Sequence, residues 1–149
     1  MLRGHFSSRY RKRSSPPRAN DMRVLLDTHA FLWWLDGDPH LAARPRRIIA
    51  QANNTILVSA ASAWEIATKV RLGKLPGAVE VANDVAGCIA RQRFHTLEIT
   101  VLHAQRAGGL VGPHRDPFDR MLAAQAQIED LPIVSNDNVF DHYGLARIW

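Results

Sequence analysis

The sequence has a single cysteine, no long apolar run and no apolar leader segment. Cys88 stands alone, which excludes an internal disulfide and a zinc site built from several cysteines, and it is most simply a small apolar residue in a helix. The longest apolar stretches are far shorter than the roughly 20 residues that span a bilayer, and the basic beginning does not resemble a secretory signal. We therefore expect a cytoplasmic protein with no membrane span.

The net charge of +5 comes from the first 21 residues. They hold six of the 19 Lys and Arg residues but only one of the 14 acids, Asp21, so the rest of the chain has thirteen of each sign. Residues 1–21 are rich in Arg, Ser and Pro and lack periodicity, which predicts a disordered basic extension. This extension could contact phosphates, but a dispensable segment is the simpler interpretation, because Met22 begins a strand and could itself be the initiator.

Residues 22–149 alternate between short apolar runs and amphipathic segments, and they suit one domain with one hydrophobic core. Strands are predicted at 23–26, 55–58, 96–99 and 133–135, with an edge strand at 146–149. Helices are predicted at 28–35, 41–52, 61–72, 79–91, 101–107 and 117–128, with a helical turn at 139–142. Strands that are separated by helices indicate an α/β fold, with a parallel sheet covered on both faces.

Four scattered carboxylates stand where a ligand site of such a sheet is expected. Asp27 and Asp137 each follow a predicted strand, and ligands of open α/β sheets bind at that edge. Glu65 borders an apolar stripe, and Asp119 lies in the first turn of a helix that Asp116 already caps. Carboxylates about 4 Å apart repel by roughly 4 kcal/mol at an effective dielectric of about 20, so a cluster of them implies a cation. Magnesium or manganese is the expected ion.

Each acid taken singly has a simpler structural explanation. Carboxylates cap helices, complement the positive helix end and form turns, and they pair with Lys one helical turn away. Asp27 can cap a helix, and Asp116 and Asp119 can complement a positive helix end. Asp137 can form a turn, and Glu65 can pair with Lys69. The coincidence of all of these positions favours one acidic pocket over four independent structural roles.

Three separated segments resemble the PIN-domain toxins of the VapC family. They are LLDTHAFLWWL at 25–35, SAASAWEI at 59–66 and HRDPFDR at 114–120, and the resemblance covers 22–149 in order and spacing. It implies a three-layer α/β/α PIN-like domain with a central, mostly parallel sheet. It has no counterpart for residues 1–21.

The resemblance also implies a function and partners. PIN-domain toxins of this family are magnesium-dependent endoribonucleases, each the toxin of a type II toxin-antitoxin pair. A cognate VapB antitoxin blocks the site and supplies DNA binding, so contact with DNA would be indirect, and the toxin is expected to form a homodimer. By position, Asp27, Glu65, Asp119 and Asp137 match the four family acids, and Asp116 could join the metal shell.

Our hypothesis from the sequence is therefore RNA hydrolysis by a water that the bound Mg²⁺ or Mn²⁺ activates, leaving a 3′-hydroxyl and a 5′-phosphate. Two basic residues, Arg115 and Arg120, are candidates for phosphate contacts, although a salt bridge explains Arg120 equally well. Two hydroxyls next to the acids, those of Thr28 and Ser135, are candidates for contacts in the pocket.

Other classes of protein remain as alternatives. A receiver domain would need adjacent acids near the first strand and a Lys after a late one, and a dehalogenase-like phosphatase would need an acid where His29 stands. A non-catalytic interaction module, whose acids only cap helices, would show no rise in melting temperature with metal.

Overall fold

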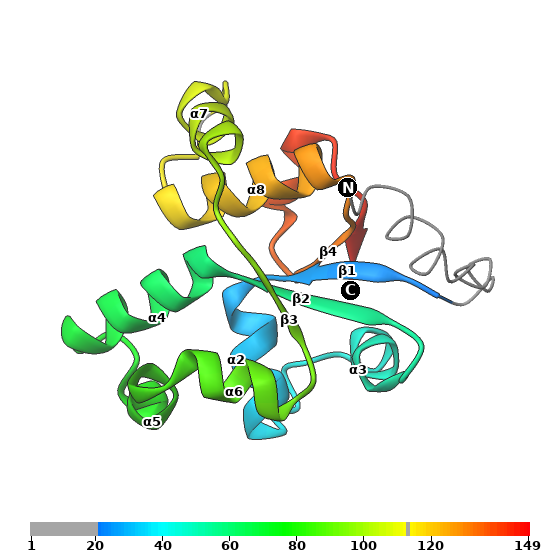
Figure 1. The fold of residues 1–149 in the computed structure, drawn as a ribbon, viewed down its shortest axis with the longest axis vertical. Coiled ribbons are helices and arrows are strands. Elements are labelled where there is room, and N and C mark those ends of the chain that lie inside the picture. The colour runs from blue at the N-terminus through cyan, green and yellow to red at the C-terminus, as the bar shows by residue number, and fades with distance from the viewer. Residues whose placement is uncertain (1–20, 113) are drawn as a thin grey trace, which may run out of the picture.

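Five short strands lie side by side in one sheet at the centre of the molecule (Figure 1). The computed structural model describes residues 21–112 and 114–149, so the predicted extension 1–21 lies outside it except for Asp21. The strands are β1 (Arg23–Leu26), β2 (Thr55–Ser59), β3 (His95–Leu97), β4 (Ile133–Val134) and β5 (Arg147–Ile148). Their order is β3-β2-β1-β4-β5, and all four neighbouring pairs are parallel. The predicted parallel α/β sheet is confirmed.

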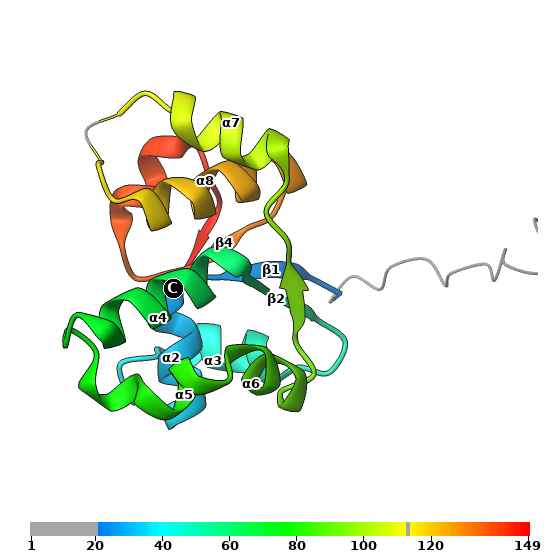
Figure 2. The ribbon, with the colours of Figure 1, turned by 60° about the vertical axis from the view of Figure 1, so that its left-hand side comes forward.

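Helices cover both faces of this sheet, which makes three layers (Figures 1 and 2). One layer contains α2 (Thr28–Asp36), α3 (Ala43–Ala50), α4 (Ala60–Arg71), the short 3-10 turn η1 (Pro76–Ala78), α5 (Val79–Asn83) and α6 (Val85–Arg91). The opposite layer contains α7 (Val101–Gly109), α8 (Pro117–Glu129) and the 3-10 segment η2 (Asn138–Tyr143). This is the α/β/α arrangement predicted from the sequence.

The prediction of one continuous helix over residues 79–91 is wrong, because the structure has two helices there. The segment breaks at Asp84, whose backbone is non-helical at φ −157° and ψ 68°. The Asp84 carboxylate accepts a hydrogen bond from the Gly87 backbone N–H at 2.9 Å and so begins α6 as a new helix. A short acidic side chain that bonds to nearby backbone competes with helix continuation, which explains the break. The other predicted helices and strands are present, with ends that agree or differ by at most two residues.

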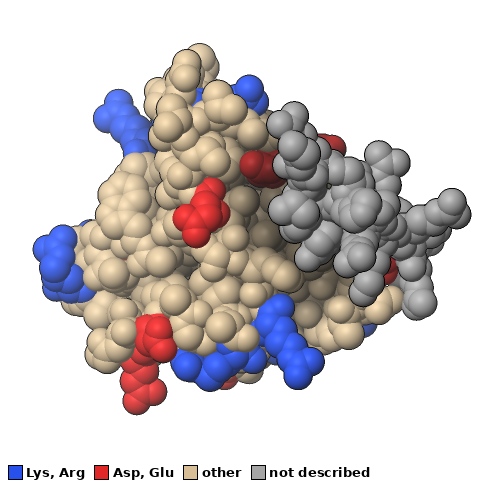
Figure 3. Space-filling view, in the orientation of Figure 1, with Lys and Arg blue, Asp and Glu red and all other residues tan. Residues whose placement is uncertain are grey.

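Charged side chains of both signs are dispersed over the face of the molecule seen in Figure 3. Lys and Arg side chains lie mostly around its margin, and one acidic side chain lies near its centre. This agrees with the balance of thirteen basic and thirteen acidic residues after residue 21.

Within the part of the chain that the structure describes, no helix is long and apolar enough to cross a bilayer.

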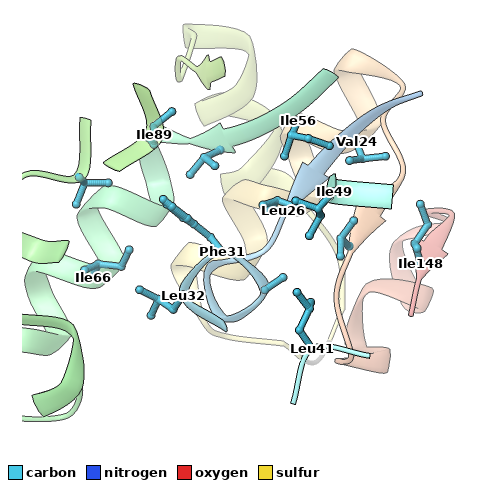
Figure 4. Packing of buried hydrophobic residues seen from close by; sticks show 14 of the residues in the cluster. Val24, Leu26, Phe31, Leu32, Leu41, Ile49, Ile56, Ile66, Ile89 and Ile148 are labelled. Carbon is cyan, nitrogen blue, oxygen red and sulfur yellow. The ribbon is translucent and has the colours of Figure 1, made fainter. Parts of the chain in front are cut away.

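The core has two halves, one on each face of the sheet. Val24 and Leu26 of β1 pack with Phe31 and Ile66 on the side of α2 (Figure 4). Leu25, between them in sequence, faces the other way and packs in a second cluster with residues of α8 and η2. Since successive strand residues point to opposite faces, a central parallel strand is apolar throughout. The buried sheet gives a rigid support to the residues that follow its strands.

Candidate active site at the carboxyl edge of the sheet

The carboxyl ends of β1 and β4 bring Asp27 and Ser135 together. Leu26 pairs with Val134 in the parallel register, and the Asp27 backbone N–H donates to the Val134 carbonyl at 3.0 Å. The next residue on each strand therefore emerges at the same edge. Two segments more than a hundred residues apart in sequence thus form one side of the candidate site.

Asp27 is a buried carboxylate, with 6% of its surface exposed. Its Oδ1 accepts a hydrogen bond from the Ala30 N–H at 2.7 Å, which makes Asp27 the N-cap of α2. Burial raises the pKa of Asp27 to about 6, against hydrogen bonds from Ser135 and Ala30 that lower it, and the charge of Asp119 raises it further. Burial therefore makes the ionised form of Asp27 unfavourable in the folded protein.

Ser135 connects Asp27 to Asp137. Its buried hydroxyl bonds to the Asp27 carboxylate and also accepts from the Asp137 backbone N–H at 3.0 Å. The Asp137 carboxylate itself is exposed and caps η2, with Oδ1 accepting from the Val139 N–H at 3.0 Å. Asp137 is therefore at the same edge, but its carboxylate is engaged outside the buried part of the site.

Glu65 reaches the site from α4. Ser59 ends β2 and caps α4 by accepting from the Ala61 N–H at 2.9 Å, so the helix begins at the carboxyl edge of the sheet. Glu65 is 4% exposed, and its Oε2 forms a close ion pair with the ammonium of Lys69 one turn further along. A nearly buried carboxylate thus has a charged partner in place.

The start of α8 contributes two further acids. Asp116 caps the helix, with Oδ1 accepting from the N–H groups of Phe118 at 2.8 Å and Asp119 at 3.1 Å. Asp119 Oδ2 lies 2.7 Å from His114 Nε2. Burial raises the pKa of Asp119, the His114 hydrogen bond lowers it, and the charges of Asp116 and Glu65 raise it, with a net rise. The charges of two other carboxylates thus contribute to the raised pKa of Asp119.

These relations place the acids near the carboxyl edge of the sheet but not in one compact cluster. Asp119 interacts electrostatically with Asp27, Glu65 and Asp116, whereas Asp137 is joined to Asp27 only through Ser135. Within residues 21–112 and 114–149, no three His, Cys, Asp or Glu side chains are close enough together to hold a metal ion. The convergence expected from the sequence is therefore partial, because each carboxylate is turned toward an internal donor.

The chemistry of the pocket nevertheless suits a hard divalent cation. Its donors are carboxylate oxygens, the preferred ligands of Mg²⁺. The pKa values of Asp27 and Asp119 are both raised, so a nearby positive charge would stabilise their ionised forms. One cation, the Lys69 ammonium, already lies against Glu65. The residues fit the ion by type and by charge.

Two of the expected substrate contacts have internal partners. The Thr28 hydroxyl is buried and donates to Ser62 Oγ at 2.9 Å, which ties α2 to α4. Arg120 donates to the carbonyls of Ala107, Gly108, Leu110 and His114, at distances from 2.7 to 3.4 Å. These contacts favour structural roles for both residues. Arg115 is exposed near the start of α8 and remains a candidate for a phosphate contact.

The sequence did not predict that Lys69 and His114 hold site carboxylates in place. Lys69 was considered only as a surface partner of Glu65, yet Glu65 is buried and the pair lies in the pocket. The i, i+4 spacing beside an apolar stripe was the available signal. The His114 ring holds Asp119, with 2.7 Å between His114 Nε2 and Asp119 Oδ2. No sequence pattern indicates that pairing.

Comparison with known proteins identifies the family. The model of the PIN domain matches residues 24–145, which is most of the chain and includes every acid described above. The chain belongs to the PIN domain family. The resemblance to PIN-domain toxins that the three sequence segments carried is therefore confirmed, and the receiver and phosphatase alternatives are excluded.

The chain is similar to a curated ribonuclease and to chains of two solved VapBC structures. Ribonuclease VapC16 of Mycobacterium tuberculosis is 44% identical over 73 residues, which cover 46% of this chain and 50% of the relative. The chain thus matches about half the length of that curated relative. Two solved complexes share the fold, VapBC2 from Rickettsia felis bound to a DNA fragment from their promoter and VapBC-1 from nontypeable Haemophilus influenzae.

The structural matches cover nearly the whole PIN domain. The Rickettsia felis chain has a TM-score of 0.60 and 19% identity, covering 85% of this chain and 98% of the other. The Haemophilus influenzae chain has a TM-score of 0.55 and 14% identity, with 85% and 97% covered. At these identities the matches establish the fold alone.

Proposed function

We propose that this PIN domain is a divalent-metal-dependent endoribonuclease and the toxin of a type II toxin-antitoxin pair. The observation that carries the proposal is the electrostatic coupling of Asp119 with Asp27, Glu65 and Asp116 at the carboxyl edge of the sheet. The sequence relative named as a ribonuclease supports the same activity. Asp27, Glu65 and Asp119 would hold Mg²⁺ or Mn²⁺, with Asp137 or Asp116 completing the set.

The residues of the chain have distinct parts in this proposal. Bound Mg²⁺ or Mn²⁺ would supply an activated water and would offset charge on the scissile phosphate. Asp27 is held in orientation by the Ala30 N–H and by Ser135, and Asp119 by His114. Arg115 would bind a neighbouring phosphate of the RNA backbone. Arg120 would shape the preceding loop through its carbonyl contacts.

The proposed partner is a VapB-type antitoxin that acts on the toxin in the cytoplasm, with DNA contacted only through the antitoxin. The two structural neighbours are VapBC complexes, which supports such a partner. A groove lined by Leu32, Trp33, Leu75 and Val81 is one docking place for an antitoxin helix. A homodimer is expected from the family resemblance. Substitution of Trp33 by Ala should weaken inhibition by the antitoxin more than the same substitution at Trp34, which lines a different groove.

A second candidate function, a non-catalytic interaction domain, has one observation in its favour. Asp27, Asp116 and Asp137 do cap α2, α8 and η2. Caps alone would leave the burial of Glu65 and the crowding around Asp119 without a purpose. The two functions differ in whether metal binds and whether RNA is cut.

The test is cleavage of total RNA by purified protein that has first been freed of metal with a chelator. We expect no cleavage until Mg²⁺ or Mn²⁺ is restored. Sequencing of the fragments should then find cuts at defined sites, and their ends should be 3′-hydroxyl and 5′-phosphate. This measurement would also identify which class of RNA is the substrate.

Two isosteric variants supply the control. Asp27→Asn keeps an N-cap acceptor but removes the charge, so the protein should fold and lose cleavage. Asp130→Asn makes the same change before β4, at the opposite edge of the sheet, where Asp130 is exposed. It should retain cleavage. A folded Asp27→Asn variant that cuts as fast as the wild type would overturn the proposal.

A further inference from the structure

One of the site acids is paired with a cation that belongs to the chain itself. The Lys69 ammonium forms an ion pair with Glu65, and the side chains are 26% and 5% exposed. Ion pairs at i, i+4 on a solvated helix face contribute little to stability. This pair is different, since a nearly buried carboxylate depends on it for neutralisation.

The Lys69 ammonium also faces the start of α8. Its Nζ lies 6.0 Å from the centre of the Phe118 ring, and Phe118 stands between the two acids of that helix. Figures 1 and 2 show the N-terminal end of α8 beside α4. Burial lowers the pKa of Lys69, but Glu65, Asp116 and Asp119 outweigh it and leave the pKa raised. The ammonium therefore pairs with Glu65 and is also influenced by the charges of Asp116 and Asp119 at the start of α8.

We propose that Lys69 is a built-in competitor of the divalent cation, and that an ion fills the pocket only after it displaces this ammonium from Glu65. The inference rests on the proposed function, since it concerns the same acids. Carboxylate oxygens that face an ammonium are not free to bind a second cation, and two positive charges a few ångströms apart repel. Lys69 thereby sets the concentration of Mg²⁺ at which the enzyme becomes active.

The competition gives Lys69 two effects of opposite sign. Without a divalent ion, the ammonium keeps buried Glu65 from being an unpaired charge, and so it stabilises the fold. With a divalent ion, the same ammonium opposes binding. A purely structural lysine would have the first effect only, so the affinity for the ion distinguishes the two roles.

The experiment is isothermal titration of Mn²⁺ into metal-freed protein. Lys69→Gln should bind Mn²⁺ about tenfold more tightly than the wild type, because a repelling charge is gone. Lys69→Arg retains the charge and should bind near the wild-type level. Lys74→Gln removes an exposed charge outside the pocket and is the matched control, with no change expected.

Thermal unfolding of the same proteins gives a second readout. Lys69→Gln should have a lower melting temperature than the wild type in chelator, and a larger rise when Mn²⁺ is added. If removal of the lysine prevents folding, the double variant Glu65→Gln with Lys69→Gln has no unpaired charge. It should bind Mn²⁺ more tightly than Glu65→Gln alone.

The outcomes separate this inference from the proposed function. If Mn²⁺ binds to the wild type and Lys69→Gln binds it equally or more weakly, Lys69 is not a competitor, and the nuclease proposal stands. If Mn²⁺ binds to neither protein, the proposed function fails and the inference fails with it.

Discussion

The imidazole Nε2 of His114 lies 2.7 Å from Oδ2 of Asp119, five residues away across the start of α8. This bond opposes the rise in pKa that burial and the charges of Asp116 and Glu65 impose on Asp119. His114 therefore helps to keep Asp119 ionised and fixes the orientation of its carboxylate. Proton binding and metal binding at Asp119 are expected to compete.

His114→Ala should shift the pH dependence of metal binding. Loss of the hydrogen bond removes an influence that lowers the pKa of Asp119, so that carboxyl will ionise at a higher pH. The acid side of the profile of Mn²⁺ affinity against pH should move upward. His95→Ala, at an exposed position of β3, serves as control. An unmoved profile would show that His114 does not act on Asp119.

Asp27→Asn should stabilise the metal-freed protein while abolishing its activity. The folded protein holds a proton on Asp27 that the unfolded chain has released, so ionisation of this group costs stability as pH rises from 3.8 to about 6. The difference corresponds to about 3 kcal/mol at pH 7. Asn avoids this cost and still caps α2. Urea unfolding should show the full gain above pH 6 and none below pH 3.8; equal stability at pH 7 would contradict it.

Arg120→Gln should loosen the loop that precedes α8. Its guanidinium donates to the carbonyls of Ala107, Leu110 and His114, and loss of these charge-assisted bonds should cost about 2–3 kcal/mol of unfolding free energy. Hydrogen exchange should then accelerate around residues 107–112. A variant with wild-type stability and hydrogen exchange, but weaker RNA binding, would show that Arg120 contacts phosphate instead.

Arg115→Gln should have the complementary effect. Arg115 is exposed, so its loss should change stability by less than about 0.5 kcal/mol. Affinity for RNA, measured in chelator to prevent cleavage, should fall, and its dependence on salt should weaken by about one unit of log–log slope. Unchanged affinity and slope would remove Arg115 from the substrate surface.

Much of the fold follows from local sequence patterns. The uniformly apolar run of β1 predicts a strand buried on both faces, and Leu25 and Leu26 do pack on opposite sides of the sheet. Asp27 could be placed at the carboxyl edge for the same reason, because it follows that run. The break at Asp84 could not be predicted in this way, since an Asp within an amphipathic pattern is compatible with a continuous helix.

The internal partners of the acids were harder to predict than the acids themselves. The Arg120 contacts depend on where the carbonyls of Ala107, Leu110 and His114 lie relative to α8, and no periodicity encodes those positions. Ser135 was expected beside the pocket, but its simultaneous bonds to Asp27 and to the Asp137 backbone depend on the register of β1 with β4. Such tertiary contacts determine how the carboxylates are oriented.

Direct measurement of metal binding tests the central claim most sharply. Mn²⁺ should be titrated into metal-freed wild type, Asp119→Asn and Asp130→Asn, because Asp119 is the acid that is coupled to three others. We predict that the wild type and Asp130→Asn bind Mn²⁺ alike and that Asp119→Asn binds it at least about tenfold more weakly. Equal affinity of all three proteins, or no binding by the wild type, would contradict the account.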